Sequence, residues 1–203
     1  MLLIDLQNDF VEGGALEVTG GRGIVEIANR LMPKFELVVA TQDWHPADHQ
    51  SFASQHRGLA VGDRFFLAGL EQTAWPDHCI QDSFGAEFVS TLNQDRIQRV
   101  IRKGSDRSID SYSGFFDNGH RRSTGLEEYL RERNVSHVFV MGLATDYCVR
   151  ATVLDAIEQG FQTTLIVDGC RGVELRAGDI ERAVKEMIDA GAKIANSNAT
   201  FGK

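Results

Sequence analysis

Cysteine is scarce in this chain, and the few cysteines do not pair in the sequence. Three are present among 203 residues, Cys79, Cys148 and Cys170, and no two of them form a C-x-x-C motif. An odd number of widely separated cysteines argues against the disulfide framework that holds small secreted domains together. We therefore expect a protein of a reducing compartment, the cytoplasm.

Basic charge and long apolar runs are also lacking. The 21 lysines and arginines are outnumbered by 29 aspartates and glutamates, which gives a formal net charge of -8. Nucleic acids and anionic membranes need a basic face, so this charge argues against both as partners. The first apolar run, residues 1–4, ends at Asp5 and is too short for a signal peptide or a membrane span. A small-molecule partner is expected, and the sequence leaves a monomer and a homo-oligomer equally open.

The order of elements predicts an α/β fold in a single domain that spans residues 1–203. The chain is 42% hydrophobic and long enough to bury one sizeable core. Its apolar patterns predict strands at residues 1–4, 37–41, 99–103, 137–141, 164–167 and 193–196, and helices at residues 24–31, 87–92, 124–130, 145–159 and 181–190. Such alternation indicates a six-stranded, mostly parallel sheet of order 3-2-1-4-5-6 with helices on both faces. Residues 43–82 show no long periodic run and are expected to be irregular and functional.

Three reactive side chains follow strands of the predicted sheet and so meet at one of its edges. Asp5 follows the first strand and Lys103 ends the third. Cys148 lies in the first turn of the next helix, which Thr145 or Asp146 is expected to cap. A helix start lowers the pKa of a thiol, and burial raises that of a carboxyl group that could take its proton. Together the three supply nucleophile, base and counter-charge, although a buried cysteine, a loop-capping carboxylate and a snorkelling lysine explain each one singly.

Aspartate and histidine residues within residues 43–82 have the spacing of metal ligands. Asp43 and His45 follow a strand, and residues i and i+2 of an extended chain face the same side. His49 or His78 could complete a mixed oxygen and nitrogen site, which suits zinc, manganese or iron when positions stay open for water. Solvated loop residues explain the same spacing equally well.

Aromatic residues occur in the same loops. Phe10, Trp75 and Tyr112 lie near the expected ends of strands and could enclose a flat ring. Packing between loops is the alternative explanation for all three residues.

Several motifs resemble those of bacterial nicotinamidases, which are cysteine hydrolases of the isochorismatase-like superfamily. The resemblance runs essentially from end to end and is carried by Asp-Leu-Gln-Asn-Asp-Phe (5–10), Asp-Trp-His-Pro (43–46), Trp-Pro-Asp-His-Cys (75–79), Lys-Gly (103–104), Asp-Ser-Tyr-Ser (110–113), Gly-Leu-Ala-Thr-Asp-Tyr-Cys-Val (142–149) and Asp-Gly-Cys-Arg-Gly (168–172). It implies the isochorismatase-like hydrolase fold. It also implies hydrolysis of nicotinamide to nicotinate and ammonia through a cysteine thioester, a reaction of NAD salvage, and hydrolysis of pyrazinamide.

The same resemblance implies a role for each candidate residue. The implied catalytic triad is Asp5, Lys103 and Cys148. The implied oxyanion hole consists of the N–H groups of Ala144 and Cys148, next to a cis peptide between Leu143 and Ala144. One divalent metal ion, zinc in the first place with manganese or iron as alternatives, is implied to be held by Asp43, His45 and His78, whereas His49 is a ligand in only some relatives. The implied substrate-binding residues are Phe10, Trp75 and Tyr112.

Other functions fit parts of this pattern. An isochorismatase or an N-carbamoyl amide hydrolase would share the superfamily, but the former lacks the nucleophile Cys148 and the metal motif argues against both. A non-catalytic metal-binding scaffold is a different class of function. Such a scaffold is expected to have lost at least one of Asp5, Lys103 and Cys148, and this chain retains all three.

Overall fold

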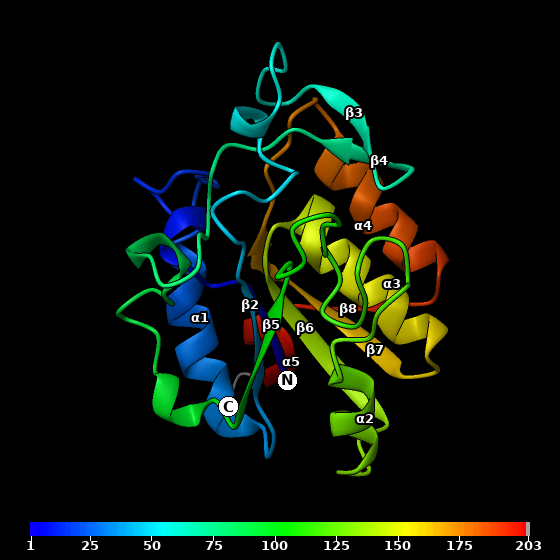
Figure 1. Ribbon diagram of the computed structural model, residues 1–203. Coiled ribbons are helices and arrows are strands. Elements are labelled where there is room, and N and C mark those ends of the chain that lie inside the picture. Colours follow the sequence, from blue (N-terminus) through cyan, green and yellow to red (C-terminus); the bar gives the residue numbers. More distant parts are fainter. Residues whose placement is uncertain (202–203) are drawn as a thin grey trace.

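A six-stranded parallel sheet forms the middle of the molecule (Figure 1). The computed structural model describes residues 1–201, so residues 202–203 of the predicted domain lie outside the described residues. The strands of the sheet are β1 (Leu2–Ile4), β2 (Val39–Asp43), β5 (Arg99–Lys103), β6 (His137–Leu143), β7 (Gln162–Arg171) and β8 (Lys193–Ala195). Their order is β5-β2-β1-β6-β7-β8. The first to sixth expected strands are β1, β2, β5, β6, β7 and β8, so this order confirms the predicted 3-2-1-4-5-6.

Helices cover both faces of this sheet, as Figure 1 shows for α1 on one side and α3 and α4 on the other. The helices are α1 (Gly23–Leu31), α2 (Leu126–Arg131), α3 (Arg150–Glu158), α4 (Asp179–Asp189) and α5 (Ser197–Phe201). Helix α1 buries Ile24, Ala28 and Leu31, whose spacing of three to four residues forms one apolar stripe. Within residues 1–201, no helix combines the length and the apolar composition that a membrane crossing requires.

Strand β1 lies between β2 and β6 and is buried on both faces. All three of its residues are apolar, which is the pattern of an inner strand in a parallel sheet. At its end Ile4 pairs with Gly142 of β6, where a side chain would place its Cβ 2.2 Å from the Ile4 carbonyl oxygen. Only glycine therefore allows β6 to approach β1 this closely, and the approach brings the residues that follow the two strands together.

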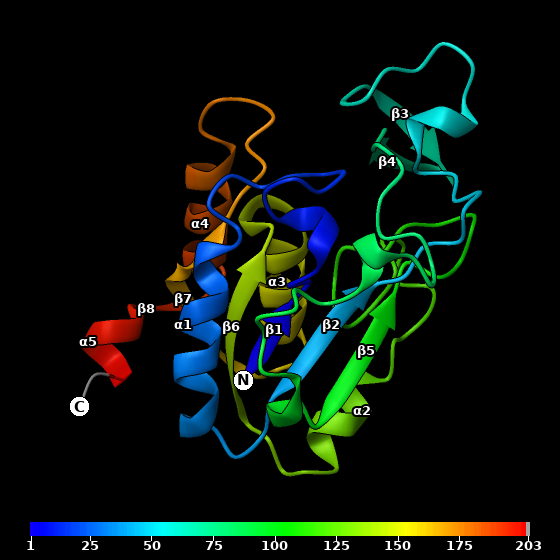
Figure 2. The same cartoon turned by 90° about the vertical axis from the view of Figure 1, so that its left-hand side faces the viewer.

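A small hairpin rises above the sheet within the segment that was predicted to be irregular. It consists of β3 (Arg64–Leu67) and β4 (Leu70–Thr73), paired antiparallel, and Figure 2 shows it away from the main body of the molecule. Four-residue strands give little periodic signal, and Phe66 at the tip is largely exposed. The pairing of these two strands therefore depends on tertiary contacts and could not be predicted from a periodic sequence pattern.

The predicted helix at residues 87–92 is wrong. Backbone groups that a helix would have paired internally bond instead to the loop after β1: the Asn8 N–H donates to the Glu87 carbonyl at 2.9 Å, and the Val89 N–H donates to the Leu6 carbonyl at 3.0 Å. These bonds satisfy the backbone of residues 87–89 in an extended conformation, and the Leu92 N–H closes a turn by donating to the Val89 carbonyl at 2.8 Å. Tertiary structure therefore overrides the weak helical pattern.

Candidate active site

Lys103, the last residue of β5, is the centre of a buried cluster of charged groups. Its Nζ atom lies 2.9 Å from Asp5 Oδ2, 2.5 Å from Asp43 Oδ1 and 3.3 Å from Cys148 Sγ, and it donates to the Ser111 carbonyl at 3.0 Å. Burial lowers the pKa of the amine, but the carboxylates of Asp43 and Asp5 outweigh burial and hold it well above its ordinary value. The structure thus brings together the three residues of the implied triad around one permanent positive charge.

Asp5 leaves the end of β1 in an uncommon backbone conformation. Its φ angle of 49° is in the left-handed region, and its carboxylate accepts a hydrogen bond from the Thr41 hydroxyl at 2.6 Å. Burial raises the pKa of Asp5 to about 6, although Lys103 and Thr41 oppose the increase. The group is therefore a stronger proton acceptor than an exposed aspartate, as its position at a buried strand end predicts.

Cys148 lies at a helix start, as predicted, but this helix begins in an unexpected way. Residues Thr145–Val149 form a π-helical turn that continues into α3, and no side chain caps its first N–H groups. The predicted cap by Thr145 or Asp146 is therefore wrong. The Asp146 carboxylate instead accepts hydrogen bonds from two N–H groups of the loop after β7, at 3.0 and 2.8 Å, those of Val173 and Glu174.

The Cys148 thiol has a raised pKa, which corrects the expectation that the helix start lowers it. Burial lifts the pKa of this thiol well above its ordinary value; Lys103 lowers it, and Asp5 raises it both by charge and by a side-chain hydrogen bond. The helix start does not outweigh burial, because the side chain is only 7% exposed. The resting site therefore contains a thiol directed at a carboxylate that can take its proton.

The turn between β6 and Cys148 contains the implied cis peptide. The bond between Leu143 and Ala144 is cis, and Ala144 lines the same pocket as Cys148. The carbonyl of Ala144 accepts hydrogen bonds from the N–H groups of Tyr147 and Val149, both at 3.1 Å, which fixes the turn. The backbone of this turn thus borders the space beside the thiol, where the implied oxyanion hole would lie.

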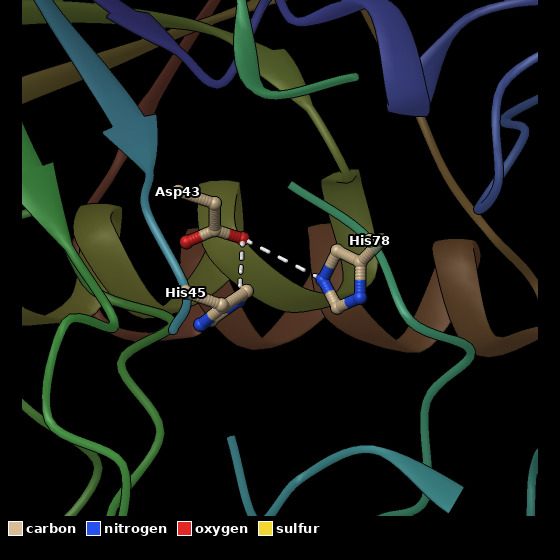
Figure 3. Close-up of side chains that lie close together, drawn as sticks. All are labelled: Asp43, His45 and His78. Atoms are coloured by element: carbon tan, nitrogen blue, oxygen red, sulfur yellow. Dashed lines mark ion pairs between the residues drawn. The ribbon is translucent and has the colours of Figure 1, made fainter. Parts of the chain in front are cut away.

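Asp43, His45 and His78 converge beside this cluster, as Figure 3 shows. The Asp43 Oδ2 atom lies 3.6 Å from His45 Nε2 and 3.9 Å from His78 Nε2, and the three ligand atoms are all within 4.8 Å of one another. The other oxygen of Asp43 is the one that contacts Lys103. All three side chains are buried, so an enclosed oxygen and nitrogen site replaces the alternative of solvated loop residues.

The histidines are held so that Nε2 is the available atom. His45 Nδ1 lies 2.8 Å from the Gly104 carbonyl and His78 Nδ1 lies 2.8 Å from the Pro76 carbonyl. Gly104 has no room for a side chain, because a Cβ would lie 2.4 Å from His45 Cε1. Burial lowers the pKa of His78 to about 4, which favours a neutral ring with a lone pair on Nε2. Backbone carbonyls at Nδ1 are the usual support of metal-binding histidines, so the residues present fit a metal ion.

His49 lies next to this trio but is not one of its members. Its ring centroid is 4.4 Å from that of His45, and its Nδ1 atom is 2.7 Å from the Ser51 hydroxyl. Its buried Nε2 atom has no hydrogen-bond partner among the described residues. His49 forms a second group of possible ligands with His45 and Asp110, and Asp43 is not a member of that group. His49 therefore lies beside the candidate metal site.

The three predicted aromatic residues border the pocket in front of Cys148. Phe10, Trp75 and Tyr112 line it together with four residues that the sequence did not single out, namely Leu16, Asp110, Tyr147 and Val173. Trp75 meets Tyr147 edge to face, with ring centroids 4.8 Å apart. The position of Tyr147 directly before Cys148 was a signal that could have found it, whereas Val173 enters the pocket only through the fold.

Known proteins match this chain over nearly its whole length. The family model of the isochorismatase domain matches residues 1–199. A nicotinamidase of Escherichia coli (strain K12) is 50% identical over 198 residues, which cover 96% of this chain and 92% of the relative. Two solved structures are also similar. A nicotinamidase and pyrazinamidase of Acinetobacter baumanii has a TM-score of 0.96 at 43% identity and covers 98% of this chain and 96% of its own. A pyrazinamidase of Pyrococcus horikoshii in complex with zinc has a TM-score of 0.79 at 37% identity, with coverages of 96% and 97%.

Proposed function

The chain belongs to the isochorismatase family, and we propose that it is a nicotinamidase that hydrolyses nicotinamide to nicotinate and ammonia by cysteine chemistry. The observation that carries the proposal is the contact of the buried Lys103 ammonium with both the Asp5 carboxylate and the Cys148 thiol. Nucleophile, base and counter-charge are the groups that amide hydrolysis through a thioester needs. The activity of the E. coli relative supplies the substrate.

In the first half of the reaction, Asp5 takes the proton of the Cys148 thiol as the sulfur attacks the carboxamide carbon. The resulting oxyanion is stabilised by the N–H groups of Ala144 and Cys148. Asp5 then gives its proton to the departing nitrogen, the C–N bond breaks and ammonia leaves. Lys103 keeps its charge throughout and stabilises the carboxylate before the proton transfer and the thiolate during it.

The second half of the reaction removes the acyl group from the sulfur. A water molecule gives a proton to Asp5 and attacks the thioester carbon, and the oxyanion again rests on the backbone N–H groups. When the C–S bond breaks, Cys148 recovers its proton from Asp5 and nicotinate is released. The same carboxyl group thus acts as base and acid in both halves, which suits a pKa of about 6.

Asp43, His45 and His78 are proposed to hold one divalent metal ion, with zinc favoured by the relative solved with zinc and manganese or iron as alternatives. When bound, such an ion supplies a Lewis-acidic position that can hold a ring nitrogen of the substrate.

Aromatic residues of the chain would enclose the substrate ring. Phe10, Trp75 and Tyr112 provide apolar surface on which a pyridine or a pyrazine can stack. Pyrazinamide is therefore a second proposed substrate. Release of nicotinate would place the enzyme in NAD salvage in the cytoplasm.

The test is ammonia release from nicotinamide by the purified, zinc-loaded protein, with nicotinate measured in the same samples. The proposal expects the two products in equal amounts. If the protein hydrolysed other carboxamides but did not hydrolyse nicotinamide, it would be a different amide hydrolase of the superfamily. Metal binding without any hydrolysis would identify a non-catalytic scaffold.

A further inference from the structure

We infer that Gln7 is a positioning residue for the candidate metal centre, because its side chain bonds to both backbone polar groups of Asp43 on the side where the sheet has ended. The inference rests on the proposed metal site and concerns a residue that does not itself face the ion. Gln7 belongs to the loop that links β1 to the rest of the active site, two residues after Asp5.

The carboxamide of Gln7 pairs with both backbone groups of Asp43. Its Nε2 atom donates to the Asp43 carbonyl at 2.8 Å, and its Oε1 atom accepts from the Asp43 N–H at 2.8 Å. The second hydrogen of Nε2 is directed to the Ala86 carbonyl at 2.9 Å. The side chain is completely buried, so water cannot take over these bonds if the carboxamide is lost.

Asp43 needs this support because of the way the sheet ends. On one side β5 still pairs with β2 at Asp43, opposite Lys103. On the other side β1 pairs with β2 only at Val39 and Ala40, so no strand reaches Asp43 there. The Gln7 carboxamide offers one donor and one acceptor, as a strand backbone does, and continues the ladder by a side chain.

The position of Asp43 has to be accurate because its two oxygens serve different partners. Oδ1 accepts a hydrogen bond from Lys103 at 2.5 Å, whereas Oδ2 faces the Nε2 atoms of His45 and His78. A rotation or shift of the Asp43 backbone would move Oδ2 away from the two histidines. Loss of the Gln7 carboxamide should therefore weaken metal binding, and outer-shell partners of metal ligands typically contribute 10- to 100-fold in affinity.

The chain offers a closely matched control in Gln42. Its side chain is also buried, and its Nε2 atom donates to the same Ala86 carbonyl at 2.9 Å. Its Oε1 atom accepts from Arg102, not from Asp43. Gln42→Met thus removes a buried carboxamide next to Asp43 in sequence without removing a bond to the Asp43 backbone.

The experiment measures Zn²⁺ affinity by competition with a chromophoric chelator, using metal-stripped wild type, Gln7→Met and Gln42→Met. Methionine has nearly the shape of glutamine but lacks its hydrogen bonds. We expect the zinc Kd to rise about 10-fold or more in Gln7→Met and to stay within about twofold of the wild type in Gln42→Met. The thermal midpoints of the two metal-free variants should be similar, because each variant loses a buried carboxamide.

If Gln7→Met does not fold, Gln7→Asn replaces it, since its amide is one methylene too short to reach both groups of Asp43 and the same loss of zinc affinity is expected. An unchanged zinc Kd in a folded Gln7 variant, or an equal loss in Gln42→Met, would overturn the inference and leave the proposed metal site intact. A wild type that binds no zinc would overturn the proposed metal site and this inference with it.

Discussion

At the scale of single residues, the chemistry of the site depends on one cation shared by several acidic groups. The Lys103 ammonium contacts two carboxylates and a thiol, all of them buried. Two buried carboxylates against one ammonium leave an excess negative charge, which a divalent ion beside Asp43 would offset. Burial raises the pKa of both Asp5 and Cys148, so the arrangement favours a thiol beside a carboxylate over a preformed thiolate.

The first prediction at this scale concerns the nucleophile. Cys148→Ala should reduce ammonia release from nicotinamide by about 10³-fold or more, because no other group can form the thioester. The variant should fold, since alanine fits in the space of cysteine, and circular dichroism checks this. Cys170 is the matched control: it is buried, and its Sγ atom donates to the Ile166 carbonyl at 3.4 Å and does not contact the Lys103 cluster, so Cys170→Ala should keep most activity. Substantial turnover by a folded Cys148→Ala would contradict the mechanism.

The second prediction separates two aspartates of the same loop. Asp5→Asn removes the proton acceptor and should lower kcat by about 100-fold or more, the scale of a positioned general base. Asp9 instead accepts bonds from the N–H groups of Cys79 at 2.7 Å and Ala15 at 3.2 Å. Asp9→Asn should therefore lower the thermal midpoint more than it lowers kcat. Equal losses of kcat at unchanged thermal stability would show that the base has been assigned to the wrong residue.

At the scale of elements, the reactive residues lie at strand ends, and the β3–β4 hairpin contacts residues that line the pocket. Lys103, Asp43 and Asp5 end or follow β5, β2 and β1, which are neighbours in the sheet. The hairpin contributes Gln72, whose Nε2 atom lies 2.9 Å from both Asp110 Oδ2 and the Tyr112 hydroxyl. A hairpin that looks peripheral in Figure 2 thus contacts residues of the substrate pocket through the buried Gln72 side chain.

The third prediction tests this connection. Gln72→Leu leaves the Asp110 carboxylate without one donor and leaves Tyr112 held by Trp75 alone, at 3.0 Å. Losing such a buried partner costs about 1–3 kcal/mol, so we expect KM for nicotinamide to rise roughly 10-fold with a smaller change in kcat. Glu71→Gln, on the same hairpin, alters only an exposed ion pair with Arg64 and should leave KM unchanged. Equal KM values for wild type and Gln72→Leu would refute the link between hairpin and pocket.

At the scale of the whole molecule, the candidate metal site joins segments that are distant in sequence. Asp43 ends β2, His45 follows it, and His78 comes after the hairpin, in a loop that bonds back to the segment after β1. An ion held by all three would therefore bind the folded chain and not the unfolded chain. Metal binding should then contribute to folding stability by linkage.

The fourth prediction concerns removal of the metal. Chelation should lower the thermal midpoint and the rate with nicotinamide, and added zinc should restore both.

The metal-loaded enzyme should hydrolyse benzamide, which lacks the ring nitrogen, with a much lower kcat/KM than nicotinamide, and chelation should narrow that difference in kcat/KM. Equal hydrolysis of the two amides by the loaded enzyme, or full nicotinamide turnover by His78→Ala, would mean that no metal ion binds the ring nitrogen of the substrate.

Strand pattern and motifs were sufficient to predict the sheet and the reactive residues. Buried parallel strands are short apolar runs, and polar residues follow them at their carboxyl ends, so residues 1–4 and the sheet order could be predicted without any long-range contact. For the same reason Asp5, Lys103 and Cys148 could be expected at one edge, and their motifs identified the superfamily.

The chemical behaviour of these residues depends on long-range contacts that no local pattern predicts. The pKa of Cys148 depends on its burial and on Asp5, which lies far away in the sequence, so local helix reasoning gave the wrong direction. Backbone bonds to the loop after β1 kept residues 87–89 extended, and a turn follows at residues 90–91 in place of a helix. The hydrogen-bonding roles of Gln7 and Gln72 could not be predicted from their neighbours in the sequence. A carboxamide has such a role only when the fold places backbone or side-chain partners within hydrogen-bond distance of it.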